Sequence, residues 1–355
     1  MTAYLNGLAT TVPAHAIPQD LAKTTAARIL GPRYESFERM SGAFENSGVE
    51  RRYSVAPLDW FETPKVWPER NDLHVRGATE LFVRTAAQAL AKAGWSADSV
   101  DTVVTVSTTG IATPSIEARA WKAMGFRADL HRVPVFGLGC AGGVSGMAIA
   151  RNMAVADPGS RVLMVSVETC TLSFRSDRLQ KADIIATVLF GDGAAAACLS
   201  TAKGDADVPV VRVEAGRERI WPDTLGIMGW DVDEAGLGVV FDRSIPEFIR
   251  TRMGEAASWA LGASDLARAD IARFVCHPGG AKVVEALEAA LGLTPGSLVE
   301  ERSILRDFGN MSSPTVLFVL ERVLAGGAEG RMIMSALGPG FTASFLPIRV
   351  GRFND

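Results

Sequence analysis

Short, nearly continuous apolar runs alternate along this chain with longer segments in which apolar residues recur every three or four positions. The β-branched runs at residues 100–107 and 161–167 are typical of strands that are buried on both faces. Residues 72–94 and 116–124 have helical spacing, and the first of these segments is rich in alanine and ends at a glycine. Strands that alternate with helices in this way predict an α/β layered fold.

The same order of elements recurs in outline after a small, polar stretch at residues 202–207. We therefore predict two halves, residues 1–205 and 206–355, related by an internal duplication. Helical spacing predicts further helices at residues 19–44, 245–261, 278–291 and 314–324. Further strands are predicted at residues 3–12, 271–276, 331–336 and 341–350.

One predicted strand leads into a run of small residues around a cysteine. Residues 132–136 form the strand, Gly139-Cys140-Ala141-Gly142-Gly143 follows, and helical spacing then continues to about residue 155. Exposed N–H groups and the positive end of the helix dipole favour a thiolate at Cys140, and the glycines leave room for a substrate. Cys140 is therefore a candidate nucleophile, and a buried structural cysteine is the alternative.

The composition argues against a nucleic-acid-binding protein, a metalloprotein and a membrane-spanning protein. The chain has 355 residues, of which 48% are hydrophobic and 21% charged, with a net charge of -4 and no basic run that could follow a nucleic-acid backbone. The four cysteines are far apart and form no CxxC pair, so we expect no zinc site, no other metal site and a reducing compartment. No apolar run is long enough to cross a membrane, and we expect a cytoplasmic protein.

Two further residues lie at junctions where ligands commonly bind. His277 follows a buried strand and precedes Pro-Gly-Gly, whereas Asn310 lies between Gly309 and small residues before an apolar helix. An ordinary hydrogen-bonded histidine and a turn or N-cap asparagine are the alternatives. Cys276 would point to the opposite face of its strand and pack, and Asp192 is interpreted as a turn residue.

Together these groups suggest a condensation of two thioesters. The imidazole of His277 would hold Cys140 as a thiolate, which takes an acyl group from a first thioester. His277 and Asn310 would then donate to the oxygen of a second thioester as it becomes an enolate. Because asparagine donates without adding charge, the malonyl carboxylate is free to leave as carbon dioxide.

Five motifs occur in the order found in one known family. They are Gly139-Cys140-Ala141-Gly142-Gly143, Leu189-Phe190-Gly191-Asp192-Gly193-Ala194-Ala195, His277-Pro278-Gly279-Gly280, Gly309-Asn310-Met311-Ser312-Ser313 and Gly338-Pro339-Gly340. With them the chain resembles the type III polyketide synthases, which are chalcone synthase-like enzymes of the thiolase superfamily. The resemblance implies a thiolase-like αβαβα fold of two duplicated halves, a homodimer, and coenzyme A thioesters used without a carrier-protein arm or cofactor.

The resemblance also assigns site residues. Cys140, His277 and Asn310 match the family's catalytic triad, and Phe190 matches its gatekeeper between the coenzyme A tunnel and the cavity, with a core aromatic as the alternative. The positions that match the family's cavity lining are Cys170, Ser173, Trp230, Val239, Ser312 and Thr113, the last matching a methionine that reaches the partner's cavity. Arg39 matches an arginine that binds coenzyme A, and a solvated helix face is the alternative.

The cavity positions differ from those of plant chalcone synthases. Trp230 stands where they have glycine, although it could also be a surface or core tryptophan, and Gly229-Trp230-Asp231 looks more like bacterial alkylresorcinol and alkylpyrone synthases. We therefore expect an enzyme that loads an acyl-CoA starter, a fatty one, onto Cys140, extends it with malonyl-CoA and cyclises it to an alkylresorcinol or alkylpyrone. The alternatives are a ketoacyl-ACP synthase III-like enzyme that condenses once and a catalytically silent partner subunit of the same fold.

Overall fold

The computed structural model describes residues 2–34, 37–178, 180–204 and 209–353, apart from the side chains of Arg33, Glu38 and Arg39. Its main sheet has the strand order β12-β13-β14-β8-β1-β7-β6-β4-β5, with β9 paired to β14. The strands in that path are β12 (Arg273–Cys276), β13 (Gly330–Gly338), β14 (Thr342–Gly351), β8 (Val210–Val213), β1 (Ala3–Thr11), β7 (Asp192–Ser200), β6 (Val162–Thr169), β4 (Thr102–Val106) and β5 (His131–Val135). The other strands are β9 (Arg217–Ile220), and two separate pairs, β2 (His15–Pro18) with β3 (Arg51–Ser54) and β10 (Met228–Asp233) with β11 (Gly236–Phe241).

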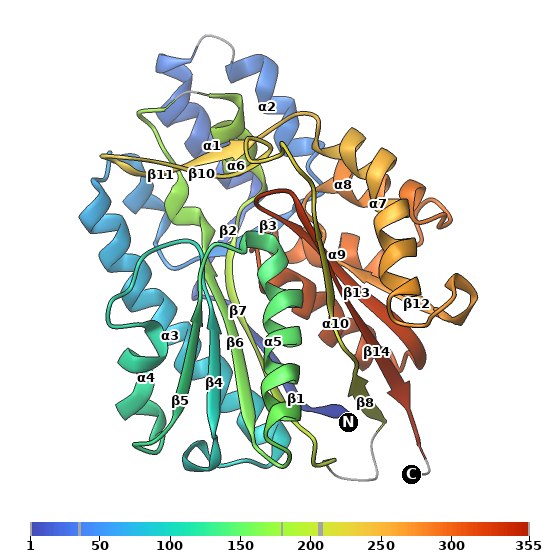
Figure 1. Ribbon diagram of the computed structural model, residues 1–355. Helices are drawn as coiled ribbons and strands as arrows, with labels where there is room; N and C mark the ends of the chain where they lie inside the picture. The colour runs from blue at the N-terminus through green and yellow to red at the C-terminus, as the bar shows by residue number, and fades with distance from the viewer. Residues whose placement is uncertain (1, 35–36, 179, 205–208, 354–355) are drawn as a thin grey trace.

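Helices cover and divide this sheet, as Figure 1 shows. The α-helices are α1 (Gln19–Leu30), α2 (Phe37–Glu45), α3 (Trp67–Ala93), α4 (Ile116–Met124), α5 (Gly142–Ala156), α6 (Lys181–Leu189), α7 (Ile245–Gly262), α8 (Ala281–Ala290), α9 (Val299–Phe308) and α10 (Thr315–Ala325). Three apolar cores separate the layers: α3 and α4 pack on β1, β4, β6 and β7, whereas α7 and α8 pack on β12–β14. In the third core, α5 and α10 lie between the two halves, which gives five layers.

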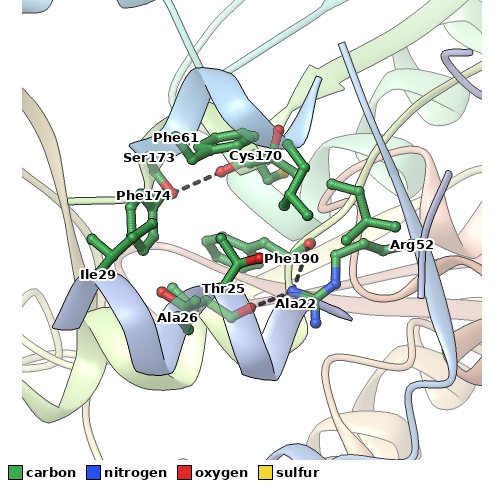
Figure 2. A pocket seen from close by; sticks show the side chains of 15 residues that line it. Ala22, Thr25, Ala26, Ile29, Arg52, Phe61, Cys170, Ser173, Phe174 and Phe190 are labelled. Carbon is green, nitrogen blue, oxygen red and sulfur yellow. Dashed lines mark hydrogen bonds between the residues drawn. The ribbon is translucent and has the colours of Figure 1, made fainter. Parts of the chain in front are cut away.

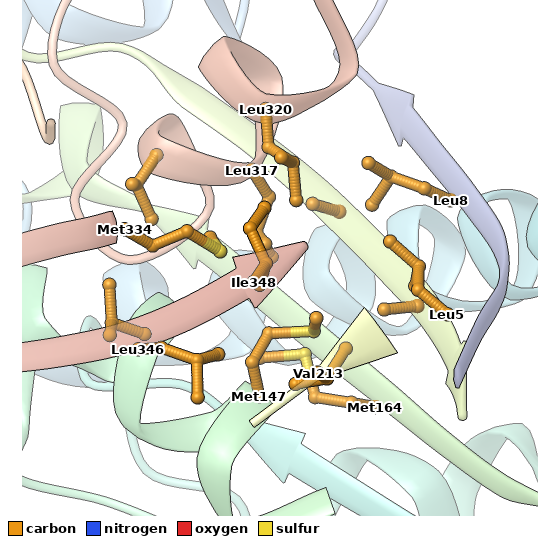
Figure 3. Close-up of a cluster of buried hydrophobic side chains, with 14 of the residues drawn as sticks. Leu5, Leu8, Met147, Met164, Val213, Leu317, Leu320, Met334, Leu346 and Ile348 are labelled. Atoms are coloured by element: carbon orange, nitrogen blue, oxygen red, sulfur yellow. The ribbon is translucent and has the colours of Figure 1, made fainter. Parts of the chain in front are cut away.

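The core between the two halves explains why the chain after Cys140 is so apolar. Figure 3 shows Met147 of α5 and Met164 of β6 close to Val213 of β8, with Leu346 and Ile348 of β14 beside them. All five side chains are buried. Because α5 contacts strands of both halves, it has no broad polar face, and small residues dominate its sequence.

Most of the predicted elements are present, and α4 has the predicted bounds. The segment predicted as one helical stretch at residues 19–44 forms two helices, α1 and α2, because Gly31 and Pro32 end the first. Helix α3 starts at Trp67, before the predicted start at residue 72, and ends at Ala93, where Gly94 in the left-handed conformation stops it as expected. Helix α6 and the hairpin β10–β11 were not predicted, and the division at residues 205 and 206 stays a prediction.

No helix within the described part of the chain is both long and apolar enough to cross a membrane.

Candidate active site

Cys140 lies where β5 gives way to α5, within the 3-10 turn Gly139–Ala141. Its side chain is 7% exposed. The preceding Gly139 has φ +48°, and a Cβ there would lie 2.6 Å from Cδ of Pro339. The turn therefore needs glycine at this position, because the Gly338-Pro339-Gly340 loop of the other half packs directly against it.

The glycines after Cys140 were expected to leave room for a substrate, and this expectation is wrong. A Cβ on Gly143 would lie 2.1 Å from the carbonyl oxygen of Ser313, and one on Gly142 would lie 2.6 Å from Cγ1 of Val106. These glycines instead let α5 approach the protein's own backbone. The close approach fixes Cys140 relative to the Asn310–Ser313 segment.

His277 follows β12 directly and is 5% exposed. Its backbone N–H donates to the carbonyl of Ser335 on β13 at 2.8 Å, which continues the strand pairing to the histidine. Neither ring nitrogen has a hydrogen-bond partner among the described residues. Both nitrogens are therefore available to a substrate and to a proton.

Asn310 is fixed through its backbone and its side chain. Its backbone N–H donates to Leu189 at 2.8 Å, and its carbonyl accepts from Gly191 at 3.1 Å, so it bridges to Phe190. Oδ1 accepts the N–H of Ser312 at 2.8 Å, while Nδ2 donates to the Gly279 carbonyl at 3.2 Å. This arrangement orients the side-chain amide, and it leaves the second N–H of Nδ2 for the Cys140 sulfur or for a ligand.

Cys140, His277 and Asn310 line one cavity of about 730 Å³. Burial raises the pKa of the Cys140 thiol to about 11, although interactions with Ser312 and Asn310 oppose the rise. Burial also lowers the pKa of His277 to about 3. Burial thus favours a neutral thiol and a neutral imidazole, and the expected thiolate and imidazolium pair stays a prediction.

The sequence did not identify one buried carboxyl group near this site, that of Glu168. Glu168 of β6 is fully buried and accepts hydrogen bonds from the Thr108 N–H at 2.9 Å and from the Thr109 and Ser313 hydroxyls at 2.7 Å. Burial raises its pKa to about 7, and its negative charge contributes to the raised pKa of Cys140. The only sequence signal was a carboxylate inside an apolar strand.

There are two smaller pockets, and Cys140 lines only the first of them. The first, about 30 Å³, lies beside Cys140, and the second, about 60 Å³, lies against α1 (Figure 2). Cys170 and Phe190 line both, so these two residues separate the first pocket from the second. The predicted cavity residues Trp230, Val239 and Ser312 line the first pocket, and Ser173 lines the second.

Thr113 is exposed in the single chain and does not line these cavities.

Trp230 packs against a small buried apolar cluster of Cys170, Ala186, Phe190 and Val239. Its Nε1 donates to the carbonyl of Thr108 at 3.0 Å, and its ring meets that of Phe190 edge-on, with 6.3 Å between centroids. It is half-buried in the wall of the pocket beside Cys140. Phe190 is 6% exposed and also contacts the ring of Phe241.

The large cavity carries cations that the sequence analysis missed. Lys181 at the start of α6, Arg243 after β11 and Lys282 in α8 all line it, and all three are exposed. No short motif links these positions, so only the fold identifies them. Arg39 is in α2, but its side chain is outside the described residues.

Cys276 and Asp192 were interpreted as structural residues, and neither lines any of the three cavities described above. Cys276 is buried in the core between α7, α8 and the sheet, and its sulfur accepts from the Ser335 hydroxyl at 3.3 Å. Asp192 is the first residue of β7 rather than part of a turn, and it accepts the N–H groups of Val55 and Thr171 at 2.8 and 2.7 Å.

Both parts of the chain are similar to one family of known proteins. Residues 3–202 match the N-terminal domain of the chalcone and stilbene synthases, and residues 212–349 match the C-terminal domain of the same family. A putative chalcone synthase of Bacillus subtilis is 32% identical, over 97% of this chain and 98% of its own length. The 1,3,6,8-tetrahydroxynaphthalene synthase of Streptomyces peucetius is 35% identical, over 96% of this chain and 91% of its own.

Among solved structures, the 1,3,6,8-tetrahydroxynaphthalene synthase of Streptomyces coelicolor A3(2) superimposes with a TM-score of 0.91. The match covers 99% of this chain and 100% of that one, at 26% identity.

Proposed function

Because this chain belongs to the chalcone and stilbene synthase family of type III polyketide synthases, which condense malonyl-CoA, we propose that it extends a fatty acyl-CoA starter to an alkylresorcinol or alkylpyrone. The observation that carries the proposal is the placement of Cys140. It lies between a large cavity lined by His277, Asn310 and cations, and a narrow apolar pocket beyond Phe190.

Acyl loading uses the neutral pair of Cys140 and His277. A ring nitrogen of His277 accepts the thiol proton as the sulfur attacks the thioester carbonyl, and the coenzyme A thiolate leaves with that proton. The product is an acyl group on Cys140 and a free coenzyme A thiol. Both ring nitrogens of His277 are free to accept this proton, and neither makes a hydrogen bond to the Cys140 sulfur before a substrate binds.

Extension uses the two donors of the same cavity. As malonyl-CoA loses carbon dioxide, the electron pair of the broken carbon-carbon bond forms an enolate, whose oxygen accepts from Nδ2 of Asn310 and from His277. The enolate carbon then attacks the acyl group on Cys140. The cysteine sulfur leaves, and the chain is two carbons longer on coenzyme A.

The cations of the large cavity support the use of coenzyme A thioesters. Lys181, Arg243 and Lys282 have no ion-pair partner within the described side chains, and phosphate groups of coenzyme A are suitable partners for them. We assign the phosphates to this region rather than to Arg39 alone.

The pocket against α1 supports a linear apolar starter. Its walls include Ala22, Ala26 and Ile29 of α1, together with Phe61 and Phe174, as Figure 2 shows. These apolar walls suit an aliphatic chain, and a volume of about 60 Å³ holds a short part of one and no ring system. Phe190 and Cys170 lie where the chain would pass from Cys140 into it.

A homodimer is part of the proposal. Strand β5 ends the sheet and pairs only with β4 in the described part of the chain. Phe136, directly after it, is 59% exposed, and Ile111 is 54% exposed. An open strand edge beside exposed apolar side chains supports a contact with a second copy, which Thr113 would join. The four free cysteines support a reducing compartment such as the cytoplasm.

The experiment is an incubation of the protein with malonyl-CoA and acyl-CoA starters of increasing chain length, with mass spectrometry of the products. The proposal predicts that long starters give extended, cyclised products. A product from malonyl-CoA alone, with no starter incorporated, would instead favour the tetrahydroxynaphthalene named for the Streptomyces relatives. A requirement for an acyl-carrier protein, with one condensation only, would favour the ketoacyl synthase alternative.

A further inference from the structure

The hairpin β10–β11 brings Trp230 and Val239 to the pocket beside Cys140, yet it is not part of the main sheet. Its two strands pair with each other along Met228–Asp233 and Gly236–Phe241. An isolated two-stranded hairpin is marginally stable in water, so its position depends on contacts with other elements.

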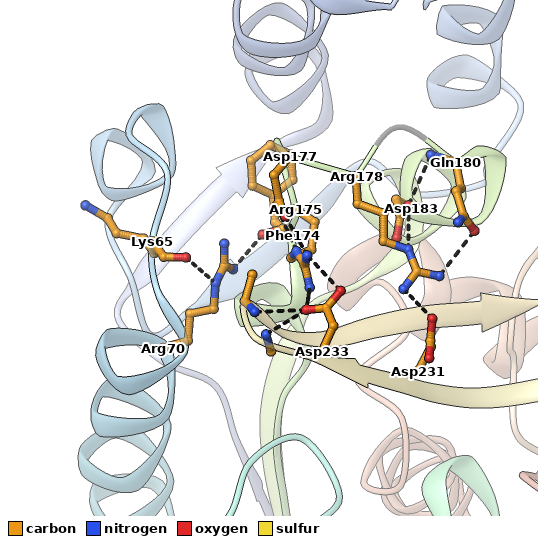
Figure 4. A network of polar contacts seen from close by, with 12 residues as sticks. Lys65, Arg70, Phe174, Arg175, Asp177, Arg178, Gln180, Asp183, Asp231 and Asp233 are labelled. Atoms are coloured by element: carbon orange, nitrogen blue, oxygen red, sulfur yellow. Dashed lines mark hydrogen bonds and ion pairs between the residues drawn. The ribbon is translucent and has the colours of Figure 1, made fainter.

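Arg175 makes the first of these contacts, as Figure 4 shows. Its side chain is 4% exposed, and its Nη1 and Nη2 atoms donate to Oδ1 and Oδ2 of Asp233 at 2.8 and 3.1 Å. The same guanidinium donates through Nε to Asp177 at 2.8 Å. Oδ1 of Asp233 also accepts the N–H groups of Ala235 and Gly236, so a two-point ion pair holds the tip of the hairpin.

Arg178 makes the second contact. Its Nη1 donates to Asp231 at 3.0 Å, and its Nε lies 3.5 Å from Asp183 of α6. The guanidinium lies directly over Gly238, where a Cβ would be 1.9 Å from Nη1. Glycine at this position therefore allows the arginine to lie across the hairpin.

The loop that carries both arginines is itself anchored. Arg70 of α3, 5% exposed, donates to the carbonyls of Leu172 and Phe174 at 2.7 and 2.6 Å, and to that of Lys65 at 3.1 Å. The hairpin is thus connected through Arg175 to the long helix α3, which packs on the sheet.

We propose that Arg175 and Arg178 are positioning residues that hold the hairpin β10–β11 closed over the pocket, and so limit the length of the chain that grows on Cys140. Trp230 contacts Thr108 and Phe190 only while the hairpin stays in place. An outward shift of the hairpin would withdraw Trp230 and Val239 and enlarge the space beside Cys140. This inference rests on the proposed function for its link to chain length.

Two variants loosen the ion pairs by different routes. Asp233→Asn keeps an oxygen for the N–H groups of Ala235 and Gly236 but removes the charge that pairs with Arg175. Gly238→Ala displaces the flexible end of Arg178 and leaves Asp233 intact. Glu255→Gln is the matched control, since it removes an exposed ion pair with Arg219, 2.9 Å long, and neither residue lines the pocket beside Cys140.

The first measurement is hydrogen-deuterium exchange of the full chain. The amides of residues 228–241 should exchange roughly tenfold faster in Asp233→Asn and in Gly238→Ala, and at the wild-type rate in Glu255→Gln. The second is the product profile, which should shift to longer chains in the two hairpin variants. Malonyl-CoA decarboxylation should stay within about twofold of wild type, because the variants leave the catalytic residues in place.

Unchanged exchange in both hairpin variants would overturn the inference, whatever the products are. Faster exchange with an unchanged product profile would overturn its link to chain length. If the wild-type protein makes no polyketide at all, the proposed function fails, and the exchange measurement alone then decides whether these arginines hold the hairpin.

Discussion

Oδ1 of Asn310 accepts the backbone N–H of Ser312 at 2.8 Å, and this contact decides which end of the amide faces the cavity. The acceptor is occupied by the protein, so the donor is left for the substrate. Ser312 itself has φ +59°, which is unusual for a residue other than glycine, and the contact helps to hold it there. The donor role of Asn310 thus depends on a local turn of its own loop.

Asn310→Asp tests this orientation. A carboxylate keeps the acceptor for Ser312 but has no N–H for the enolate, and its charge opposes the developing anion. Decarboxylation of malonyl-CoA should fall by roughly 100-fold to 1000-fold, measured as carbon dioxide release. Acylation of Cys140 by a starter should be much less affected, so equal losses in both steps would contradict the assigned role.

The pH dependence of Cys140 alkylation tests the charge state of the free site. Because burial raises the pKa of Cys140 to about 11 and lowers that of His277 to about 3, the thiolate is a minor species at pH 7. The rate of iodoacetamide reaction should rise about tenfold per pH unit between about pH 7 and 9. A plateau reached by pH 7 would show that a thiolate and imidazolium pair is present instead.

Glu168→Gln tests whether ionisation of the buried Glu168 carboxyl group destabilises the folded protein. Its pKa is about 7 when folded and near 4.5 otherwise, so the folded state binds the proton more tightly. Below pH 4.5 protonated Glu168 makes its full contribution to the free energy of unfolding. As the pH rises to 7, the free energy of unfolding falls by up to about 3 kcal/mol, because the buried group ionises. The melting temperature of Glu168→Gln relative to wild type should therefore be higher at pH 8 than at pH 5, and the reverse order would contradict this account.

Ala26→Leu tests the apolar pocket. Ala26 is buried in the pocket wall, whereas Ala27, next to it on α1, is exposed. The larger side chain should lower kcat/KM for long starters by about tenfold or more and spare short ones. Ala27→Leu is the control and should leave the preference unchanged. An equal loss for all chain lengths would mean that the starter does not occupy this pocket.

Local sequence signals predicted an element well where neighbouring residues alone mark its start and its end. The turn at Cys140 is such a case, since a strand, small residues and a helix follow each other directly. Helix α6 is the opposite case. The β-branched residues of Lys181–Leu189 favour a strand. The segment is nevertheless helical, and the helix buries Ile184 and Val188 on one face.

The candidate site was predictable in its residue types and less so in its electrostatics. Cys140, His277 and Asn310 each lie at a junction that the sequence marks. The pKa of Cys140 depends on burial by segments far along the chain and on the charge of Glu168, which no local pattern indicates. The ion pair of Arg175 with Asp233, which anchors the hairpin β10–β11, joins residues far apart in the sequence, so no local pattern indicates it.

Intact-protein mass spectrometry of the acylated enzyme tests the central claim most directly. Wild-type protein mixed with a fatty acyl-CoA should gain the mass of one acyl group, located by peptide mapping at Cys140. The acyl group should be released when malonyl-CoA is added, together with carbon dioxide and an extended product. Cys140→Ser should gain no acyl mass at the same pH. Acylation of that variant, or an acyl group on wild type that malonyl-CoA never removes, would contradict the account.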